Sequence, residues 1–168
     1  MTAPLRAPGQ GRGPLVAVDV GGTKTIVAAV DDLPSDGFHP LRPPVRFATP
    51  RDPEHFLATL LRAVNDSLPA GTRPAAVGIG APGPLESKTG VIEHSTNLGW
   101  RDLPIADLVS RELGGVPVAV GDDGNLGALG EARAGAGRGA DPYAFLALGT
   151  GLVVSGARAG RATGGGRG

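Results

Sequence analysis

The chain has 168 residues, no cysteine, and 16 basic against 16 acidic side chains. That length supplies one domain with a real core, but it is too short for two large lobes that close on a ligand. Zero net charge excludes an electrostatic preference for nucleic acid or an anionic membrane, and the lack of cysteine, with only three scattered histidines, predicts no zinc site. Because no apolar run reaches the length of a membrane span and no secretory pattern begins the chain, we expect a soluble cytoplasmic protein.

The first predicted element is a hairpin over residues 15–30. Two valine-rich runs flank the sequence Asp19-Val20-Gly21-Gly22-Thr23-Lys24, and the two glycines are predicted to supply the positive φ of a tight turn. Bare amides beside a hydroxyl and an ammonium suit a phosphate group, and Asp19 is a carboxylate of the kind that Mg²⁺ prefers. An ordinary Gly-Gly hairpin is the alternative, and this loop alone favours neither.

The elements that follow alternate between strands and helices. We predict an edge strand at 41–49, a helix at 53–68 with Asp52 as N-cap, a strand at 75–80, a brief strand at 91–92, a helix at 106–113, a strand at 116–120, a helix at 125–136 and a strand at 143–148. Residues 1–14 and 158–168, rich in glycine, proline and arginine, are predicted to be flexible tails. Antiparallel strands followed by strand and helix alternation predict an α/β fold with a mixed sheet and helices on its faces.

Two adjacent carboxylates, Asp122 and Asp123, stand between an apolar strand and a helix. They could simply cap that helix. A carboxylate in a cleft can instead accept the proton of a hydroxyl that attacks phosphorus, and we favour this interpretation because the same end of the sheet offers a phosphate loop. Glu131 is predicted to be a solvated helix residue.

Three further loops follow apolar runs. Gly149-Thr150-Gly151 repeats the pattern of the first loop, with exposed amides and a hydroxyl. Gly80-Ala81-Pro82-Gly83-Pro84 lies where open α/β sheets bind ligands, with a plain turn as the alternative. In the loop 96–100, Asn97 bonds a ligand or its own loop, and Trp100 is predicted to be a packing anchor. Two glycine loops separated by a carboxylate predict phosphoryl transfer to a hydroxyl.

These segments, in this order, resemble the ROK family of bacterial sugar kinases, within the actin-like ATPase superfamily. The matching segments are residues 19–24, 78–84, 89–91, 97–100, 117–131 and 148–151. The resemblance implies an actin-like ATPase fold, related to ribonuclease H, with helices on both faces of the sheet. It implies ATP phosphate and Mg²⁺ binding at Asp19 and Gly21–Lys24, a second phosphate loop at Gly149–Gly151, Asp123 as catalytic base and Gly83 at the sugar site.

The sequence departs from the family pattern at three places. Asp122 replaces an asparagine that contacts a sugar hydroxyl, and a carboxylate there can still accept a hydrogen bond from the sugar. Leu152–Ser155 follow the second loop where the family has further glycines, and the chain stops before the Glu-x-Gly-His segment, the cysteine cluster and the second lobe. We therefore expect residues 15–157 to be the N-terminal lobe of a glucokinase-like hexose kinase, with little or no activity in the isolated chain.

Two other functions are kept as alternatives, a sugar-responsive transcription regulator and a non-catalytic sugar- or nucleotide-binding remnant. Some members of the family carry a DNA-binding helix-turn-helix ahead of this domain, but too few residues precede Leu15 to form one. The expected partners are a sugar and ATP with Mg²⁺, with no nucleic acid and no membrane. A homodimer is expected only for the full-length protein.

Overall fold

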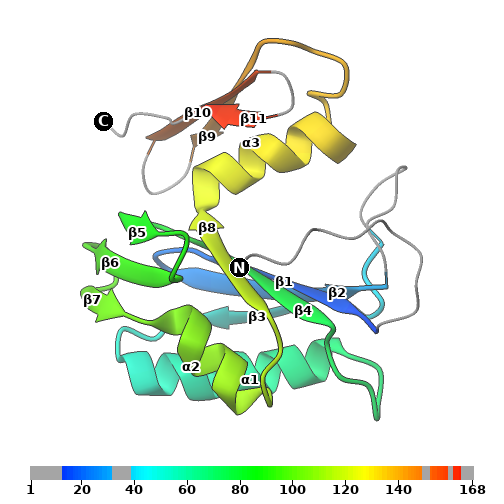
Figure 1. Ribbon diagram of the computed structural model, residues 1–168, viewed down its shortest axis with the longest axis vertical. Helices are drawn as coiled ribbons and strands as arrows, with labels where there is room; N and C mark the ends of the chain where they lie inside the picture. Colours follow the sequence, from blue (N-terminus) through cyan, green and yellow to red (C-terminus); the bar gives the residue numbers. More distant parts are fainter. Residues whose placement is uncertain (1–12, 32–38, 149–151, 159–160, 164–168) are drawn as a thin grey trace.

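A mixed five-stranded sheet forms the centre of the computed structural model, which describes residues 13–31, 39–148, 152–158 and 161–163. Its strands are β1 (Leu15–Val20), β2 (Lys24–Val30), β3 (Val45–Ala48), β4 (Ala76–Ala81) and β8 (Val118–Asp122). They lie in the order β3-β2-β1-β4-β8, with β1 antiparallel to β2 and parallel to β4 (Figure 1). The predicted α/β fold, its mixed sheet and its edge strand are confirmed.

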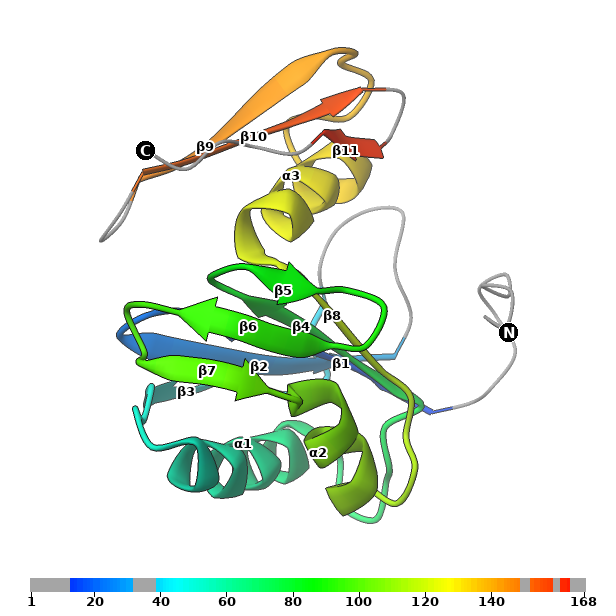
Figure 2. The same ribbon diagram turned by 60° about the vertical axis from the view of Figure 1, so that its left-hand side comes forward.

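Helices lie on both sides of this sheet (Figures 1 and 2). The helices α1 (Pro53–Ser67) and α2 (Ile105–Glu112) cover one face, and α3 (Asp123–Ala134) lies on the other side. The start of α1 is as predicted, because the Asp52 carboxylate accepts a hydrogen bond of 2.8 Å from the His55 N–H and Pro53 is the first helical residue.

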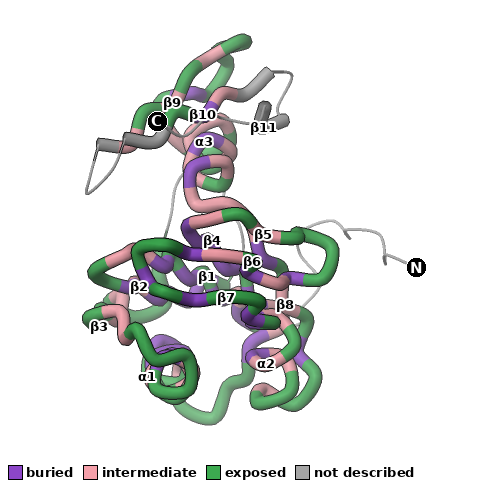
Figure 3. The backbone as a smooth tube through the Cα atoms, turned by 90° about the vertical axis from the view of Figure 1, so that its left-hand side faces the viewer, coloured by how far each residue is buried: buried purple, intermediate pink, exposed green. Residues whose placement is uncertain are grey.

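The core fills the space between the central sheet and the helices α1 and α2. Alternation along β1 buries its valines, whereas Asp19 stays on the exposed face. Phe56 and Leu60 of α1 are 1% and 0% exposed, and each such side chain contributes about 1.5–3 kcal/mol to folding. Figure 3 shows the buried residues gathered in the central sheet and the adjoining sides of these two helices. Within the described part of the chain, no helix is both long and apolar enough to cross a bilayer.

A second small sheet, which the sequence largely missed, lies beside the first. Its strands are β5 (Leu85–Glu86), β6 (Val91–Ser95) and β7 (Trp100–Leu103). Only residues 91–92 were predicted as a strand, because such short strands carry too few residues for an alternating pattern. Trp100 fixes this sheet to α1: its indole N–H donates to the Arg51 carbonyl at 2.7 Å and its ring lies 4.6 Å from that of Phe56. The prediction of Trp100 as a packing anchor is confirmed.

The last strands form a third sheet that packs on α3 (Figure 2). It contains β9 (Tyr143–Leu148), β10 (Leu152–Arg158) and β11 (Arg161–Thr163) in the order β11-β10-β9. We expected residues 143–148 to join the one mixed sheet, which is wrong because α3 lies between them and the central sheet. The short strand β11 also pairs with β10 inside a segment that was predicted to be a flexible tail.

Candidate functional site

The candidate site is built at the carboxyl ends of β1, β4 and β8. The strand register places Asp19 beside Gly80 and Gly80 beside Gly121. The first turn of α3 lies close to these glycines: a Cβ on Gly80 would be in ordinary contact with the Asp123 Cα at 3.7 Å, and one on Gly121 would lie a tight 3.1 Å from the Leu126 side chain. Asp123 therefore stands over the strand end that carries Asp19.

The carboxylates of Asp19 and Asp123 interact electrostatically. The pKa of Asp19 is raised above its ordinary value, first by loss of hydration and then by the negative charge of Asp123, while the ammonium of Lys24 opposes the rise. The Asp19 side chain nevertheless remains open on the exposed face of β1. Two carboxylates and an ammonium thus share one region at the sheet edge.

These residues fit a magnesium–phosphate group. A divalent cation relieves the repulsion between two neighbouring carboxylates, and Mg²⁺ is commonly bound by one or two carboxylates together with phosphate oxygens and water. Among the described residues, no group of three or more histidine, aspartate or glutamate side chains gathers as a metal site. Asp19 would therefore share the ion with a phosphate and water.

The loop Gly21–Lys24 differs from its prediction in one respect. Neither Gly21 nor Gly22 has a positive φ, so the expected conformational reason for the glycines is wrong. The reason is space: a Cβ on Gly21 would lie 2.8 Å from the Lys24 carbonyl oxygen, and one on Gly22 would lie 3.3 Å from the Asn97 Cβ. The Gly21 N–H also donates to that Lys24 carbonyl at 2.9 Å.

The structure places one predicted sugar-site residue, Asn97, against this loop and a second, Gly83, against the end of β6. Asn97, in the turn between β6 and β7, packs directly against Gly22. Gly83 has a φ of +114°, and a Cβ there would overlap the His94 carbonyl oxygen and lie 3.3 Å from the Ser95 Cα. Gly83 is therefore held against the end of β6, two residues before Asn97, and its contact with a sugar stays a prediction.

Asp122 is the N-cap of α3, as the capping alternative proposed. Its Oδ1 accepts a hydrogen bond of 3.0 Å from the Asn125 N–H, so the helix begins at Asp123 rather than at the predicted residue 125. Asp123 is half-buried, and its Oδ1 accepts from the Gly124 N–H at 2.8 Å. The role of Asp122 toward a sugar stays a prediction, and Gly149, Thr150 and Gly151 lie outside the described residues.

Sequence reasoning missed the role of several polar residues around the site. Thr25 is fully buried and bonds Thr49, which in turn bonds the first glycine loop. A threonine in a strand carries no signal of such a role, because threonine is common in strands for its shape alone. Glu131 lies on α3 as predicted, and its partly exposed carboxylate also accepts a hydrogen bond of 2.8 Å from the Ala136 N–H in the turn after the helix.

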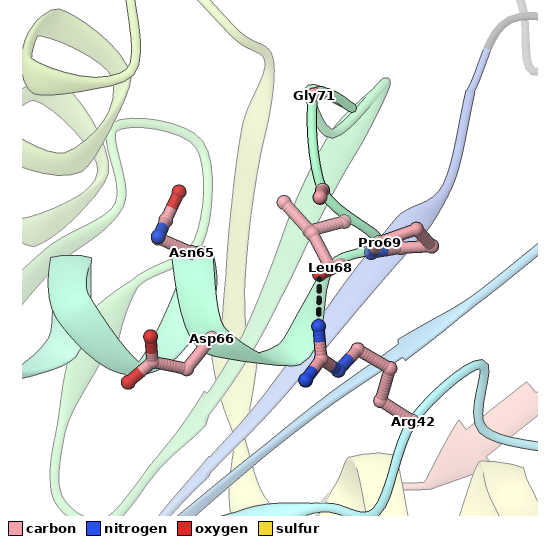
Figure 4. Close-up of a pocket in the computed structure, with 7 residues that line it drawn as sticks. Arg42, Asn65, Asp66, Leu68, Pro69 and Gly71 are labelled. Carbon is pink, nitrogen blue, oxygen red and sulfur yellow. Dashed lines mark hydrogen bonds between the residues drawn. The ribbon is translucent and has the colours of Figure 1, made fainter.

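A cavity of about 410 Å³ lies at the other end of the central sheet, where α1 ends. Its lining residues are Arg42, Asn65, Asp66, Leu68, Pro69, Ala70 and Gly71 (Figure 4). The guanidinium of Arg42 donates to the Leu68 carbonyl at 3.4 Å and so satisfies the helix end. Because β4 begins after this cavity and Asp19 lies at the carboxyl end of the parallel strand β1, the cavity is separate from the candidate site.

Comparison with known proteins identifies the family. The model of the ROK family matches residues 15–168. The chain belongs to the ROK family. A ROK family glucokinase from Streptomyces griseus, solved in complex with glucose and AMPPNP, has a TM-score of 0.75 and 32% identity to this chain, covering 90% of it and 46% of that enzyme. The expected actin-like ATPase fold is thereby confirmed.

Curated relatives of this ROK chain are both kinases and regulators. A glucokinase of Streptomyces coelicolor is 32% identical over 137 residues, which are 82% of this chain and 41% of that protein. A xylose repressor of Caldicellulosiruptor bescii is 33% identical over 76 residues, which are 45% of this chain and 19% of that protein. The chain spans less than half the length of these curated relatives.

Proposed function

We propose that this chain is the N-terminal part of an ATP-dependent hexose kinase of the glucokinase type. The observation that carries the proposal is the convergence of Asp19, Asp123 and the loop Gly21–Lys24 at one sheet edge. Phosphoryl transfer to a hydroxyl needs a base for the hydroxyl proton and fixed donors for the phosphate oxygens, and these residues supply both. The likeness to a glucokinase that was solved with glucose and AMPPNP supports the same function.

Asp123 is proposed as the catalytic base. Its carboxylate accepts the proton of the sugar hydroxyl as the hydroxyl oxygen forms a bond to the γ-phosphorus of ATP and the bond from that phosphorus to ADP breaks. The hydrogen bond from the Gly124 N–H to its Oδ1 fixes the carboxylate at the start of α3. Asn97 and Gly83 are proposed to border the sugar, together with Asp122, whose position is set by its N-cap bond.

The nucleotide phosphates are proposed to bind along the loop Gly21–Lys24. Thr23 and Lys24 are exposed there, and each has a polar group that pairs with phosphate oxygens. Asp19 is proposed to bind Mg²⁺, which supplies neutralisation of the phosphate charge when bound. Gly149, Thr150 and Gly151 are proposed as a second phosphate loop.

The complete reaction is proposed to need more chain than these 168 residues. The relatives that support the function are more than twice as long as the segment they share with this chain. Positioning of nucleotide and acceptor together accounts for much of the rate of phosphoryl transfer. We therefore expect the 168-residue chain to bind ligands but to show little or no kinase activity, and sugar-dependent ATP consumption that disappears in Asp123→Ala would contradict this.

A second candidate function is sugar sensing by a ROK regulator. The similarity to a xylose repressor favours it. A regulator needs a sugar site but no base for a hydroxyl proton and no nucleotide site. Nucleotide binding therefore separates the two candidates, because only the kinase is expected to bind Mg·ATP.

Isothermal titration of the chain with Mg·ATP and with glucose tests the proposed function. The wild type is expected to bind both, and Asp19→Asn is expected to weaken Mg·ATP at least about tenfold through loss of a charged ligand. Asp123→Asn should keep most of the nucleotide affinity because the base acts on the sugar hydroxyl. Asp66→Asn, an exposed carboxylate at the end of α1, is the matched control. Absence of Mg·ATP binding to the wild type would refute the kinase.

A further inference from the structure

We propose that Thr49 is a positioning residue for phosphate binding, which orients the backbone of the loop Gly21–Lys24 from beneath. This inference deepens the proposed function and rests on it, because that loop is taken as the nucleotide phosphate site. Thr49 follows the edge strand β3 and lies 28 positions from Gly21 in the chain, so only the folded structure brings the two together.

Thr49 bonds the loop twice. Its hydroxyl donates to the Gly21 carbonyl at 2.8 Å, and its backbone N–H donates to the Thr23 carbonyl at 3.1 Å. A peptide unit is planar and trans, so its N–H points opposite to its C=O. The bond to the Gly21 carbonyl therefore turns the Gly22 N–H away from Thr49.

A second threonine completes the arrangement. The hydroxyl of Thr25 lies 2.9 Å from that of Thr49. Since a hydroxyl has one proton and Thr49 gives its proton to Gly21, Thr25 is the donor in this pair. The order of donation runs from Thr25 through Thr49 to the Gly21 carbonyl, and such chains strengthen each bond within them. Thr25 is 0% exposed, so its hydroxyl has no access to water as a substitute partner.

The arrangement has a chemical consequence for an anion. An amide that is already fixed in direction binds phosphate without the loss of freedom that a mobile loop would suffer. The Gly22 N–H is set in this way by a bond on the opposite side of its peptide, and the Asn97 side chain packs closely on Gly22.

The test compares four variants of the 168-residue chain, with Mg·ATP as the probe. Thr49→Val removes the hydroxyl and Thr49→Ser keeps it. In Thr49→Val the buried Thr25 hydroxyl loses its acceptor, so the double variant Thr25→Val/Thr49→Val removes that hydroxyl as well. Thr72→Val is the control, because the exposed Thr72 hydroxyl bonds only the nearby Pro69 carbonyl at 2.6 Å. Each variant is measured for Mg·ATP affinity by calorimetry, for the NMR order parameter of the Gly22 amide, and for stability by urea unfolding.

We expect Thr49→Val to raise the Kd for Mg·ATP about tenfold to a hundredfold, the range for one charge-assisted hydrogen bond, and to lower the order parameter of the Gly22 amide. Thr49→Ser should stay near the wild type in both. The double variant should recover stability relative to Thr49→Val, because no buried hydroxyl is left unsatisfied, yet keep the weak affinity and the low order parameter.

A merely structural role predicts instead that affinity returns together with stability in the double variant, and that result would overturn the proposal. Unchanged affinity in Thr49→Val, with the wild type binding normally, would overturn it as well while leaving the proposed function intact. A wild type that binds no Mg·ATP would refute the proposed function and, with it, the phosphate role of Thr49. The order parameter of the Gly22 amide then still shows whether Thr49 fixes the loop.

Discussion

Replacement of Trp100 by phenylalanine tests how the candidate site is fixed to the core. Trp100 is 1% exposed, its indole N–H donates to the Arg51 carbonyl at 2.7 Å, and its ring packs on Phe56. Trp100→Phe deletes that hydrogen bond, a loss of about 1 kcal/mol. It also leaves a cavity where the second ring stood, which costs about 1–2 kcal/mol more.

The free energy of unfolding should therefore fall by about 2–3 kcal/mol, which for a domain of this size lowers the Tm by roughly 4–12 °C. Urea unfolding should be followed by circular dichroism, because Trp100→Phe removes the single tryptophan whose fluorescence would otherwise report unfolding. Leu41→Ala, a change at an exposed side chain ahead of β3, is the control and should stay within about 0.5 kcal/mol of the wild type. A fall of less than about 1 kcal/mol for Trp100→Phe would refute the inference that the indole anchors the segment after β3.

Three further predictions concern the site, its supporting loop and the separate cavity. Because the pKa of Asp19 in the folded state is raised above its ordinary value of 3.8, the wild type should lose stability as pH rises through the window above 3.8. Asp19→Asn should lack this loss. A stability difference between the two proteins that stays constant with pH would contradict the assigned cause. Gly83→Ala should destabilise by more than about 2 kcal/mol in urea unfolding, because its φ is positive and a Cβ would overlap the His94 carbonyl; a change below about 0.5 kcal/mol would show that the β4 loop relaxes. Arg42→Ala should lower the free energy of unfolding by about 0.5–1 kcal/mol, because it removes the hydrogen bond to the Leu68 carbonyl. The affinity for Mg·ATP, measured by calorimetry, should stay unchanged. Weakened affinity would connect the cavity to the nucleotide.

Features governed by neighbouring residues could be predicted from the sequence. Asp52 followed by Pro53 gave the start of α1, since both the cap bond and the fixed proline φ act within one turn. The valine-rich runs around Gly21 and Gly22 predicted β1 and β2, because short runs of β-branched apolar residues are typical of buried strands. The order of loops and carboxylates gave the family, which the match over residues 15–168 confirms.

Features governed by distant contacts could not be predicted. Gly21 and Gly22 are needed because a side chain there would crowd a backbone oxygen and Asn97, not because the backbone has a positive φ. Only the folded chain brings those atoms next to the glycines. The small sheet of β5, β6 and β7 is held against α1 by the contact of Trp100 with Phe56, which joins segments far apart in the sequence. No local sequence pattern predicts the role of Thr49, because its hydrogen-bond partner Gly21 follows a different strand, β1.

Paramagnetic broadening by Mn·ATP tests most directly whether the carboxylates and the glycine loop form one nucleotide site. In NMR spectra of the 168-residue chain, we expect the amide signals of Asp19, Gly22 and Asp123 to broaden first, because they surround the position assigned to the metal and phosphates. The signals of Asn65 and Gly71, at the separate cavity, should remain sharp. Broadening confined to that cavity, or absent from Asp19 and Asp123 at saturating Mn·ATP, would contradict the account.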